Sequence, residues 1–464
     1  MKKTTIFLLI MLYLFSLFPV SAFAASNAQD CHTLKANQML ATEHSYEGTA
    51  AAVILYERNS QTLVFAHNPD KTINPTGLVK LLTALVVLEE GNLDDLVTVK
   101  RSTLNSVGAG AVSAGLKAGE EITLRNLLYC VMISSANDAA AVMADHVAGS
   151  QEAFVEKMNA KAATLGCENT RFTNVHGLKD ERQYSTARDL AIILDEALKN
   201  EQFATFFGLT AQVIPATNMS DARILKTTNY MMDADSKYYD ARVTGGKPAA
   251  ATSSDRSMAC VAQEGECQYL AVVISAKARM SGSAVTRYTN FDEASSLLDM
   301  GFEGYSIQQV LGMEQPYGMY PVSEGKNHVV VGPDADVYAL LPNEFDFSML
   351  QLRDTRHTEA LIAPLRKGTV VGTLEIYYDS VFIGQVDILA RHDVASVSLD
   401  TVDDPSDEAK HKNGLVSVLK WLLGILAFGV LLVLTTFFVT RRSKKHKRTG
   451  AKQKKTVTTE RGEA

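Results

Sequence analysis

Three short segments carry the side chains best suited to chemistry, and each borders a predicted helix or strand. Lys80 follows a predicted helix start, so its amine can serve as a general base one turn into the helix. Ser135 and Asn137 lie at a break between two apolar helices and offer a hydroxyl and an amide for hydrogen bonds. The third segment, residues 240–245, precedes predicted strands. A lysine base near a hydroxyl is the arrangement that nucleophilic catalysis requires.

Other catalytic and metal-binding patterns are absent from the sequence. It contains no Gly-x-Ser-x-Gly elbow, no His-Glu-x-x-His motif and no phosphate-binding loop. The ten histidines are scattered singly, and His176 lies in a tight polar turn where a structural role is the more common one. No spacing of cysteine and histidine resembles a zinc site. We therefore expect neither a metal nor an organic cofactor.

The predicted elements that hold these segments follow an α+β order. Residues 50–57 and 63–66 read as strands, and a helix is expected from Gly77 to Leu88 with Thr76 as its N-cap. Further helices are predicted over 123–133 and 138–147, then one capped by Ser150 and one capped by Ser185. Strands over 258–262 and 269–276 come last. Strands, then helices, then strands predict an antiparallel sheet with helical cover rather than repeated βαβ units.

The texture of the sequence changes after residue 304. Short apolar runs such as HVVVG, VYALL and SVFIGQVDIL alternate with Gly, Pro and Asp, which predicts a small all-β domain over residues 305–396. Because some 390 residues are too many for a single core, a first domain over 25–304 is expected before it. Residues 397–414 are polar and charged and are expected to form a stalk.

The N-terminus has the three parts of a secretory signal. Lys2 and Lys3 precede an apolar run from Ile6 to Val20, and Ala22 and Ala24 supply the small residues that a signal peptidase requires. We expect residues 1–24 to be a signal peptide that is removed after Ala24.

The C-terminal region is predicted to cross a membrane once. Residues 415–440 are apolar apart from Lys420, and such a length spans a bilayer core as a helix. Residues 441–464 form a strongly basic tail, which marks the cytoplasmic side. The folded part is therefore expected outside the cytoplasmic membrane, with the C-terminus in the cytoplasm.

The charge distribution argues against a nucleic-acid partner. Of the 45 Lys and Arg residues, thirteen lie in the signal, the apolar segment or the tail, whereas only two of the 52 acidic residues do. Residues 25–414 consequently carry 32 basic against 50 acidic side chains. An ectodomain with this excess of negative charge is not expected to bind nucleic acid.

Taken together, the three segments resemble the Ser-x-x-Lys, Ser-x-Asn and Lys-Thr-Gly boxes of penicillin-binding proteins, in the same order. The chain is similar to the low-molecular-mass penicillin-binding proteins that act as D-alanyl-D-alanine carboxypeptidases. Long stretches carry this resemblance, among them LLYCVMISSANDAAAVMADHVAGS, FTNVHGL and YSTARDLA. It implies a penicillin-binding or β-lactamase-type domain, with a site between the helices and the edge of the sheet.

Compared with that family, the first box lacks its nucleophile. Gly77 stands at the position of the reactive serine, three residues before Lys80, while Ser135 and Asn137 keep the second box. Deleting the nucleophile of other serine hydrolases lowers the rate by about 10⁶. Thr76 is the remaining hydroxyl in this box, and as the expected N-cap it would turn toward the backbone.

The third box is also altered. Aligning Val243, Thr244 and Gly245 with Lys-Thr-Gly keeps the last two residues and puts valine at the lysine position. An alternative register over residues 246–249 keeps a lysine at Lys247 but loses the threonine and the glycine. The spacing from Asp240 to Thr244 favours the first register, on which the box has lost an ammonium group.

Three functional hypotheses follow from these boxes. The first is a catalytically inactive family member that binds a peptidoglycan stem peptide or another cell-wall protein. The second is an active serine-type carboxypeptidase that trims stem peptides with Thr76 or Ser135 as a substitute nucleophile. The third is a membrane-tethered spacer in which Lys80, Ser135, Asn137 and Thr244 persist only as a buried hydrogen-bond network.

Overall fold

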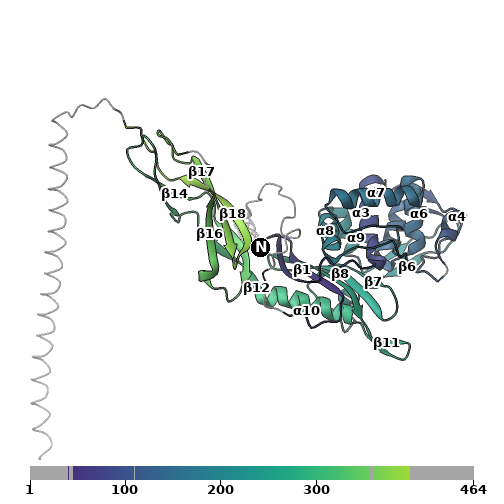
Figure 1. Ribbon diagram of the computed structural model, residues 1–464. Helices are drawn as coiled ribbons and strands as arrows, with labels where there is room; N and C mark the ends of the chain where they lie inside the picture. Colours follow the sequence, from purple (N-terminus) through teal and green to yellow (C-terminus); the bar gives the residue numbers. More distant parts are fainter. Residues whose placement is uncertain (1–39, 41–44, 109, 356–359, 398–464) are drawn as a thin grey trace, which may run out of the picture. The chain divides into compact units, whose positions relative to one another are not determined.

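The computed structural model describes residues 40, 45–108, 110–355 and 360–397 (Figure 1). The expected signal peptide, nearly all of the stalk, the predicted membrane segment over 415–440 and the basic tail lie outside these residues. Within the described part of the chain, no helix combines the length and the apolar character needed to cross a membrane.

A five-stranded antiparallel sheet forms the centre of the first domain, in the order β2-β1-β9-β8-β7. Each strand pairs with its neighbours, which leaves β2 and β7 as the two edges. The strands that the sequence predicted are all present, and β7 is an addition to them. The bounds are β1 (Ala52–Glu57), β2 (Thr62–His67), β7 (Val243–Ala250), β8 (Asp255–Glu264) and β9 (Cys267–Lys277).

Both faces of this sheet are buried, and alternate side chains of each strand face opposite ways. On β1, Ile54 and Tyr56 belong to the hydrophobic cluster shared with the main group of helices. Val53 and Leu55 belong to a second cluster, which includes Phe291 and other residues of α10 (Thr289–Gly304). This two-sided burial explains why β1 reads as a continuous apolar run in the sequence.

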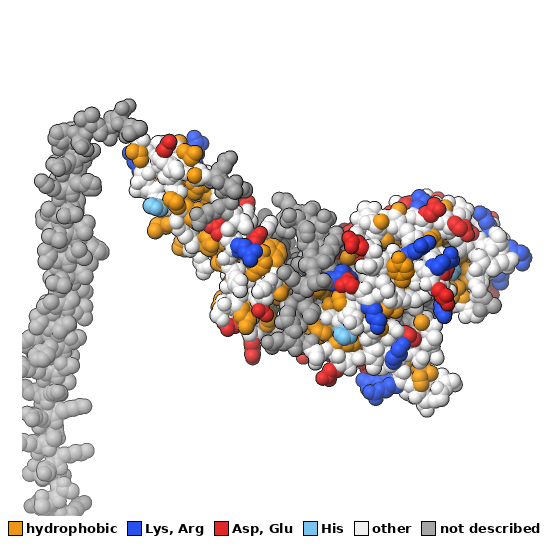
Figure 2. Space-filling view, in the orientation of Figure 1, with side chains coloured by type: hydrophobic (Ala, Val, Ile, Leu, Met, Phe, Trp, Pro, Cys, Tyr) orange, Lys and Arg blue, Asp and Glu red, His pale blue; other side chains and the backbone are white. Residues whose placement is uncertain are grey.

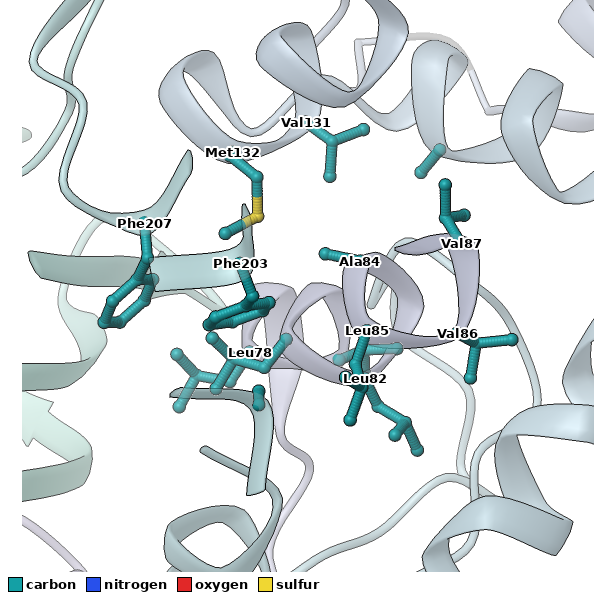
Figure 3. Packing of buried hydrophobic residues seen from close by; sticks show 14 of the residues in the cluster. Leu78, Leu82, Ala84, Leu85, Val86, Val87, Val131, Met132, Phe203 and Phe207 are labelled. Carbon is teal, nitrogen blue, oxygen red and sulfur yellow. The ribbon is translucent and has the colours of Figure 1, made fainter. Parts of the chain in front are cut away.

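The main group of helices covers the first face, and α3 is at its centre. All residues of α3 from Lys80 to Val87 are buried, because neighbouring helices surround it. Figure 3 shows side chains of α5 and α9 around the α3 core. The bounds are α3 (Lys80–Glu90), α5 (Leu124–Ser134), α6 (Asn137–Ala148), α7 (Gln151–Thr164), α8 (Ala187–Leu198) and α9 (Glu201–Phe207).

Short elements connect these helices and strands. A 3₁₀ turn, η1 (Thr76–Val79), runs directly into α3. The others are β3 (Leu96–Thr98), α4 (Arg101–Ser106), β4 (Glu121–Thr123), β5 (Ala211–Ile214), β6 (Arg223–Lys226), η2 (Tyr230–Met232), β10 (Arg279–Ser281) and β11 (Ala284–Arg287).

Two of the three predicted N-caps need correction. The Ser150 hydroxyl accepts the Ala153 N–H at 3.2 Å and caps α7 as expected. Helix α8 is capped one residue later than predicted, by Thr186, whose hydroxyl accepts the Asp189 N–H. Thr76 makes no capping hydrogen bond, because it lies inside η1 with a positive φ of 52°.

The region after α10 is a β domain, as the sequence predicted, with one short 3₁₀ turn, η3 (Phe347–Met349). A two-stranded sheet, β12-β15, accompanies a five-stranded antiparallel sheet in the order β13-β14-β18-β17-β16. Val329, Leu374 and Ile388 lie in its core. The bounds are β12 (Tyr305–Leu311), β13 (Gly318–Tyr320), β14 (Val329–Pro333), β15 (Val337–Pro342), β16 (Leu350–Thr355), β17 (Val370–Tyr378) and β18 (Val381–Ala390).

Candidate active site

Gly77 lies where η1, the loop after α5 and strand β7 meet. The position that a Cβ atom would take on Gly77 is 3.7 Å from Ser135 Oγ and 3.8 Å from Lys80 Nζ. The third of its nearest atoms is the Cβ of Ala249, at 3.3 Å. The fold therefore directs a hydroxyl and an amine from two different elements toward a residue that has no side chain.

Lys80 is buried beneath this position, at the first residue of α3. Only 2% of it is exposed, and its Nζ donates a hydrogen bond to the backbone oxygen of His176. Burial disfavours the charged amine and lowers the pKa of Lys80 to about 7. A lysine in this state exchanges its proton near neutral pH, as a general base must.

The second predicted segment is placed by the junction between α5 and α6. Ser135 ends α5 in the left-handed conformation, with φ 62°, and stays partly exposed beside Gly77. Asn137 begins α6, is buried, and its backbone N–H donates to Val112 O at 2.7 Å. None of the three atoms nearest to the Gly77 Cβ position belongs to Asn137, so the direct convergence involves Ser135 and Lys80.

Val243, predicted to stand at the lysine position of the third box, does not face the site. Its side chain belongs to the cluster on the α10 side of the sheet. A bulge between Val243 and Gly245 interrupts the alternation of side chains between the two faces of β7. Counting in steps of two from Val243 therefore does not predict which residues face the helices beyond the bulge. Thr244 is exposed, and Gly245 packs against the Phe207 ring of α9.

The residues of β7 that do reach the site are those of the alternative register. Lys247 is fully buried, and its Nζ donates to the backbone oxygens of Val131 at 3.0 Å and Met132 at 3.2 Å, both on α5. Ala249 supplies the methyl group beside Gly77. Burial, and secondarily the charge of Lys80, hold the pKa of Lys247 well below its usual value. The geometry thus favours Lys247-Pro248-Ala249 and contradicts the assignment of Val243, Thr244 and Gly245.

Comparisons with known proteins identify the family to which this fold belongs. The family profile described as D-alanyl-D-alanine carboxypeptidase matches residues 38–278, more than half of the chain. The chain belongs to the D-alanyl-D-alanine carboxypeptidase family. A second profile, described as the C-terminal domain of penicillin-binding protein 5, matches residues 305–396.

Individual relatives of this carboxypeptidase family member match different shares of the chain. The D-alanyl-D-alanine carboxypeptidase DacF of Bacillus subtilis is 27% identical over 348 residues, which are 74% of this chain and 86% of DacF. A D-alanyl-D-alanine carboxypeptidase of a Streptomyces strain is 34% identical over 217 residues, covering 44% of this chain and 74% of that protein. The crystal structure of penicillin-binding protein 5 from Haemophilus influenzae is 25% identical, with a TM-score of 0.59, and covers 76% of this chain and 99% of that one.

Within the carboxypeptidase fold, the surroundings of the Thr76 hydroxyl also differ from those expected of an N-cap. Its hydroxyl is buried, and no residue of the described chain forms a hydrogen bond with it. A positive φ at a β-branched residue is a strained backbone conformation. The strained residue directly precedes Gly77, and its hydroxyl is enclosed rather than presented to the mouth of the site.

The turn after Val175 contributes to the site, and this contribution was not predicted from the sequence. The carbonyl of His176 accepts the hydrogen bond from Lys80, and the next residue, Gly177, has φ 83°. A Cβ atom on Gly177 would fall 1.8 Å from the backbone oxygen of Thr76, so only glycine fits there. Burial, with the charge of Lys80 as a lesser cause, lowers the pKa of His176 to about 4. The FTNVHGL stretch was the only signal of this role.

Proposed function

We propose that this member of the carboxypeptidase family binds a peptidoglycan stem peptide or a cell-wall protein without hydrolysing it. One observation carries the proposal: no side-chain oxygen exists at residue 77, where Lys80 and Ser135 converge. Acyl transfer by a serine peptidase needs an oxygen that attacks the carbonyl and forms an ester. Lys80 is therefore a buried base that lacks the hydroxyl expected at residue 77.

The surroundings of Gly77 support retention of a ligand site. Gly77, Ser135, Pro248 and Ala249 are partly exposed, whereas Lys80 and Lys247 are buried behind them. Burying two amines in this way is unfavourable for folding. Their persistence next to an open edge strand is easier to explain if a ligand uses their hydrogen-bond donors.

The surface charge argues against a nucleic-acid ligand. Acidic and basic side chains are both spread over the visible face of the molecule (Figure 2). Residues 25–414 as a whole are acidic. A surface with this acidic balance is a poor match for the phosphate backbones of nucleic acid.

The alternative, an active carboxypeptidase that trims stem peptides, needs another nucleophile. The Thr76 hydroxyl is buried, which leaves Ser135, whose Oγ is the nearest hydroxyl to the missing side chain. Lys80 donates to the carbonyl of His176 rather than to Ser135 in this structure. The alternative therefore requires Lys80 to change its hydrogen-bond partner.

Acylation by a fluorescent penicillin distinguishes the two readings. The full-length chain in detergent is incubated with the label and analysed on a denaturing gel and by intact mass, with the related Streptomyces carboxypeptidase as the positive control. We expect no covalent adduct on this chain. An adduct would overturn the proposal, and its loss in Ser135→Ala or Thr76→Ala would identify the nucleophile.

Release of D-alanine provides an independent test of the same point. The full-length chain is incubated with diacetyl-L-Lys-D-Ala-D-Ala, and free D-alanine is measured with D-amino acid oxidase. We expect a rate no higher than that of buffer. Release that exceeds this rate and disappears in Ser135→Ala would establish the trimming enzyme instead.

We further propose that the protein is held in the cytoplasmic membrane by residues 415–440, with residues 25–414 outside and residues 441–464 inside. The apolar run, the basic tail and the N-terminal signal support this arrangement. Protease added to intact spheroplasts should digest the region before residue 414 and leave a tail epitope protected. Digestion of the tail epitope as well would contradict the proposed orientation.

A further inference from the structure

Lys80, whose amine lies beside Gly77, and Lys247 both have hydrogen-bond donors that no described residue accepts. A charged lysine has three N–H donors. Among the hydrogen bonds between described residues, Lys80 uses one, to His176 O, and Lys247 uses two, to Val131 O and Met132 O. In the part of the chain that the structure describes, no ion pair involves either lysine. Two buried amines, each with its pKa lowered by burial, thus lie in this part of the fold without an ion-pair partner among the described residues.

The acidic side chain that follows Ser135 and Asn137 in the sequence already has hydrogen-bond partners. Asp138, next to Asn137 on α6, accepts hydrogen bonds from the Ser113 hydroxyl and from the backbone N–H groups of Ala114 and Leu116. An external anion would give Lys80 the ion-pair partner that no described residue supplies.

We propose that this site selects a peptide that ends in a single D-alanine carboxylate, the product of a carboxypeptidase, over the uncleaved peptide that ends in D-Ala-D-Ala. The inference rests on the proposed function, because it requires binding without hydrolysis. Hydrolysis releases the last residue as free D-alanine, replaces the amide nitrogen with a second oxygen, and leaves a negative charge that the two oxygens on that carbon share. With glycine at 77, one carboxylate oxygen would approach the side-chain position that glycine leaves empty, which is 3.8 Å from Lys80 Nζ and 3.7 Å from Ser135 Oγ.

The uncleaved peptide lacks both features at that carbon. Bound in the same register, its amide is neutral at that carbon and does not balance the ammonium group, and its own terminal carboxylate lies one residue further along the peptide. Hydrogen bonds between ionised groups are roughly twice as strong as neutral ones. A chain that distinguishes the two peptide ends in this way reports whether the wall nearby has already been trimmed.

Binding of a carboxylate should be coupled to proton uptake. The groups whose charges are coupled to Lys80 are Lys247 on β7 and His176 in the preceding turn. His176 stays neutral between pH 6 and 8, because its pKa is lowered to about 4. Free Lys80, with a pKa of about 7, is half protonated at pH 7, and a bound carboxylate would keep it charged. Affinity should therefore be highest below pH 7 and fall by up to about tenfold per pH unit above it.

The test is isothermal titration of the full-length chain in detergent with diacetyl-L-Lys-D-Ala and with diacetyl-L-Lys-D-Ala-D-Ala, at pH 6 and pH 8. We expect the shorter peptide to bind about 10- to 100-fold more tightly at pH 6, as expected for one added charged hydrogen bond. Titration of the wild type in buffers of different ionisation enthalpy should show uptake of roughly half a proton at pH 7 and nearly one at pH 8. Lys80→Met should abolish the preference, whereas Lys226→Met, at an exposed position of β6, should keep it.

The outcomes separate this inference from the function on which it rests. Equal or tighter binding of the longer peptide, or binding of the shorter one without proton uptake, overturns the inference and leaves a binding protein. Binding of neither peptide overturns the inference and the stem-peptide form of the proposed function. A covalent adduct with penicillin overturns both. The wild-type proton uptake keeps the test decisive if Lys80→Met does not fold.

Discussion

Gly77 and Ala249 are so close that a side chain on Gly77 would place its Cβ atom 3.3 Å from the methyl carbon of Ala249. This distance is shorter than ordinary van der Waals contact between two carbons. In the Lys-Thr-Gly box of the family, residue 249 corresponds to the glycine in the register that the structure favours. The two substitutions are therefore complementary: the glycine at 77 leaves room for the alanine at 249.

This relationship predicts that the nucleophile cannot be restored by one change. Overpacking of a tight site costs about 1–3 kcal/mol. Gly77→Ser alone should therefore react with fluorescent penicillin slowly, and Gly77→Ser combined with Ala249→Gly should react about tenfold or more faster, measured as the rate of labelling on a gel. Ala249→Gly alone is the control and should stay unlabelled. A double variant no faster than Gly77→Ser would show that Ala249 does not obstruct the site.

The position of Val243 on the α10 side of the sheet predicts that a lysine there is harmful rather than restorative. Val243→Lys would bury an unpaired charge, which costs several kcal/mol. We expect the melting temperature of the first domain to fall by about 6 °C or more. Val213→Lys, on an exposed position of the β5–β6 hairpin, is the matched control and should change it by less than about 2 °C. If Val243→Lys were as stable as the control, the result would support the assignment of Val243, Thr244 and Gly245 to the third box.

The sequence was sufficient for the α+β order, the strands of the central sheet except β7, and the convergence of Lys80 with Ser135. Hydrophobic periodicity and the family boxes carry that information directly. The third box was misread because its register was chosen by the spacing from Asp240 to Thr244, whereas the bulge between Val243 and Gly245 determines which residues of β7 reach the site. A bulge leaves little trace in the sequence, since only the pairing with β8 defines it.

Thr76 shows a second limit of reasoning from sequence. A threonine before a helix is a common N-cap, yet here the turn from His176 to Gly177 packs against the backbone of Thr76 and fixes its positive φ. This contact joins segments about 100 residues apart, and local propensity does not report it.

The close approach of Gly177 to Thr76 predicts a strong effect of the smallest possible side chain. In Gly177→Ala the new methyl group would meet Thr76 O at 1.8 Å, so the backbone at Gly77 and the hydrogen bond from Lys80 to His176 O must shift. Gly149→Ala is a matched control, because Gly149 has φ 82° and an added Cβ atom there has no neighbour within 4 Å. The control should cost about 1 kcal/mol through its positive φ alone, and Gly177→Ala at least about 2 kcal/mol more.

Thermal unfolding of the two glycine variants gives this comparison directly. We expect Gly177→Ala to lower the melting temperature of the first domain further than Gly149→Ala by about 4 °C or more. Equal shifts in the two variants would mean that the contact between Gly177 and Thr76 does not constrain the site.

The buried amine of Lys80 makes the stability of the first domain depend on pH. Its pKa is about 7 in the folded chain and about 10.5 when unfolded, so the unfolded chain binds more protons between these values. Stability should consequently rise with pH in this window, while below pH 7 the amine is charged in both states and the full penalty remains. At 1.36 kcal/mol per pKa unit, the change over the whole window is at most about 5 kcal/mol. Lys247, whose pKa is also lowered, contributes with the same sign.

Lys80→Met therefore should be more stable than the wild type at pH 6.5, and its advantage should shrink as the pH approaches 9.5. Melting temperatures of the full-length chain measured at intervals over this range test the prediction, with Lys226→Met as the control, since Lys226 is exposed and its replacement should leave the pH profile unchanged. Parallel pH profiles of the melting temperature for wild type and Lys80→Met would contradict the prediction. They would mean that the Lys80 amine stays charged in the folded chain over the whole pH range, next to a partner outside the described residues. The reason for the expected convergence is physical: above pH 9 the neutral amine and the methionine side chain differ little in the cost of burial, whereas below pH 7 only one of them brings a charge into the core.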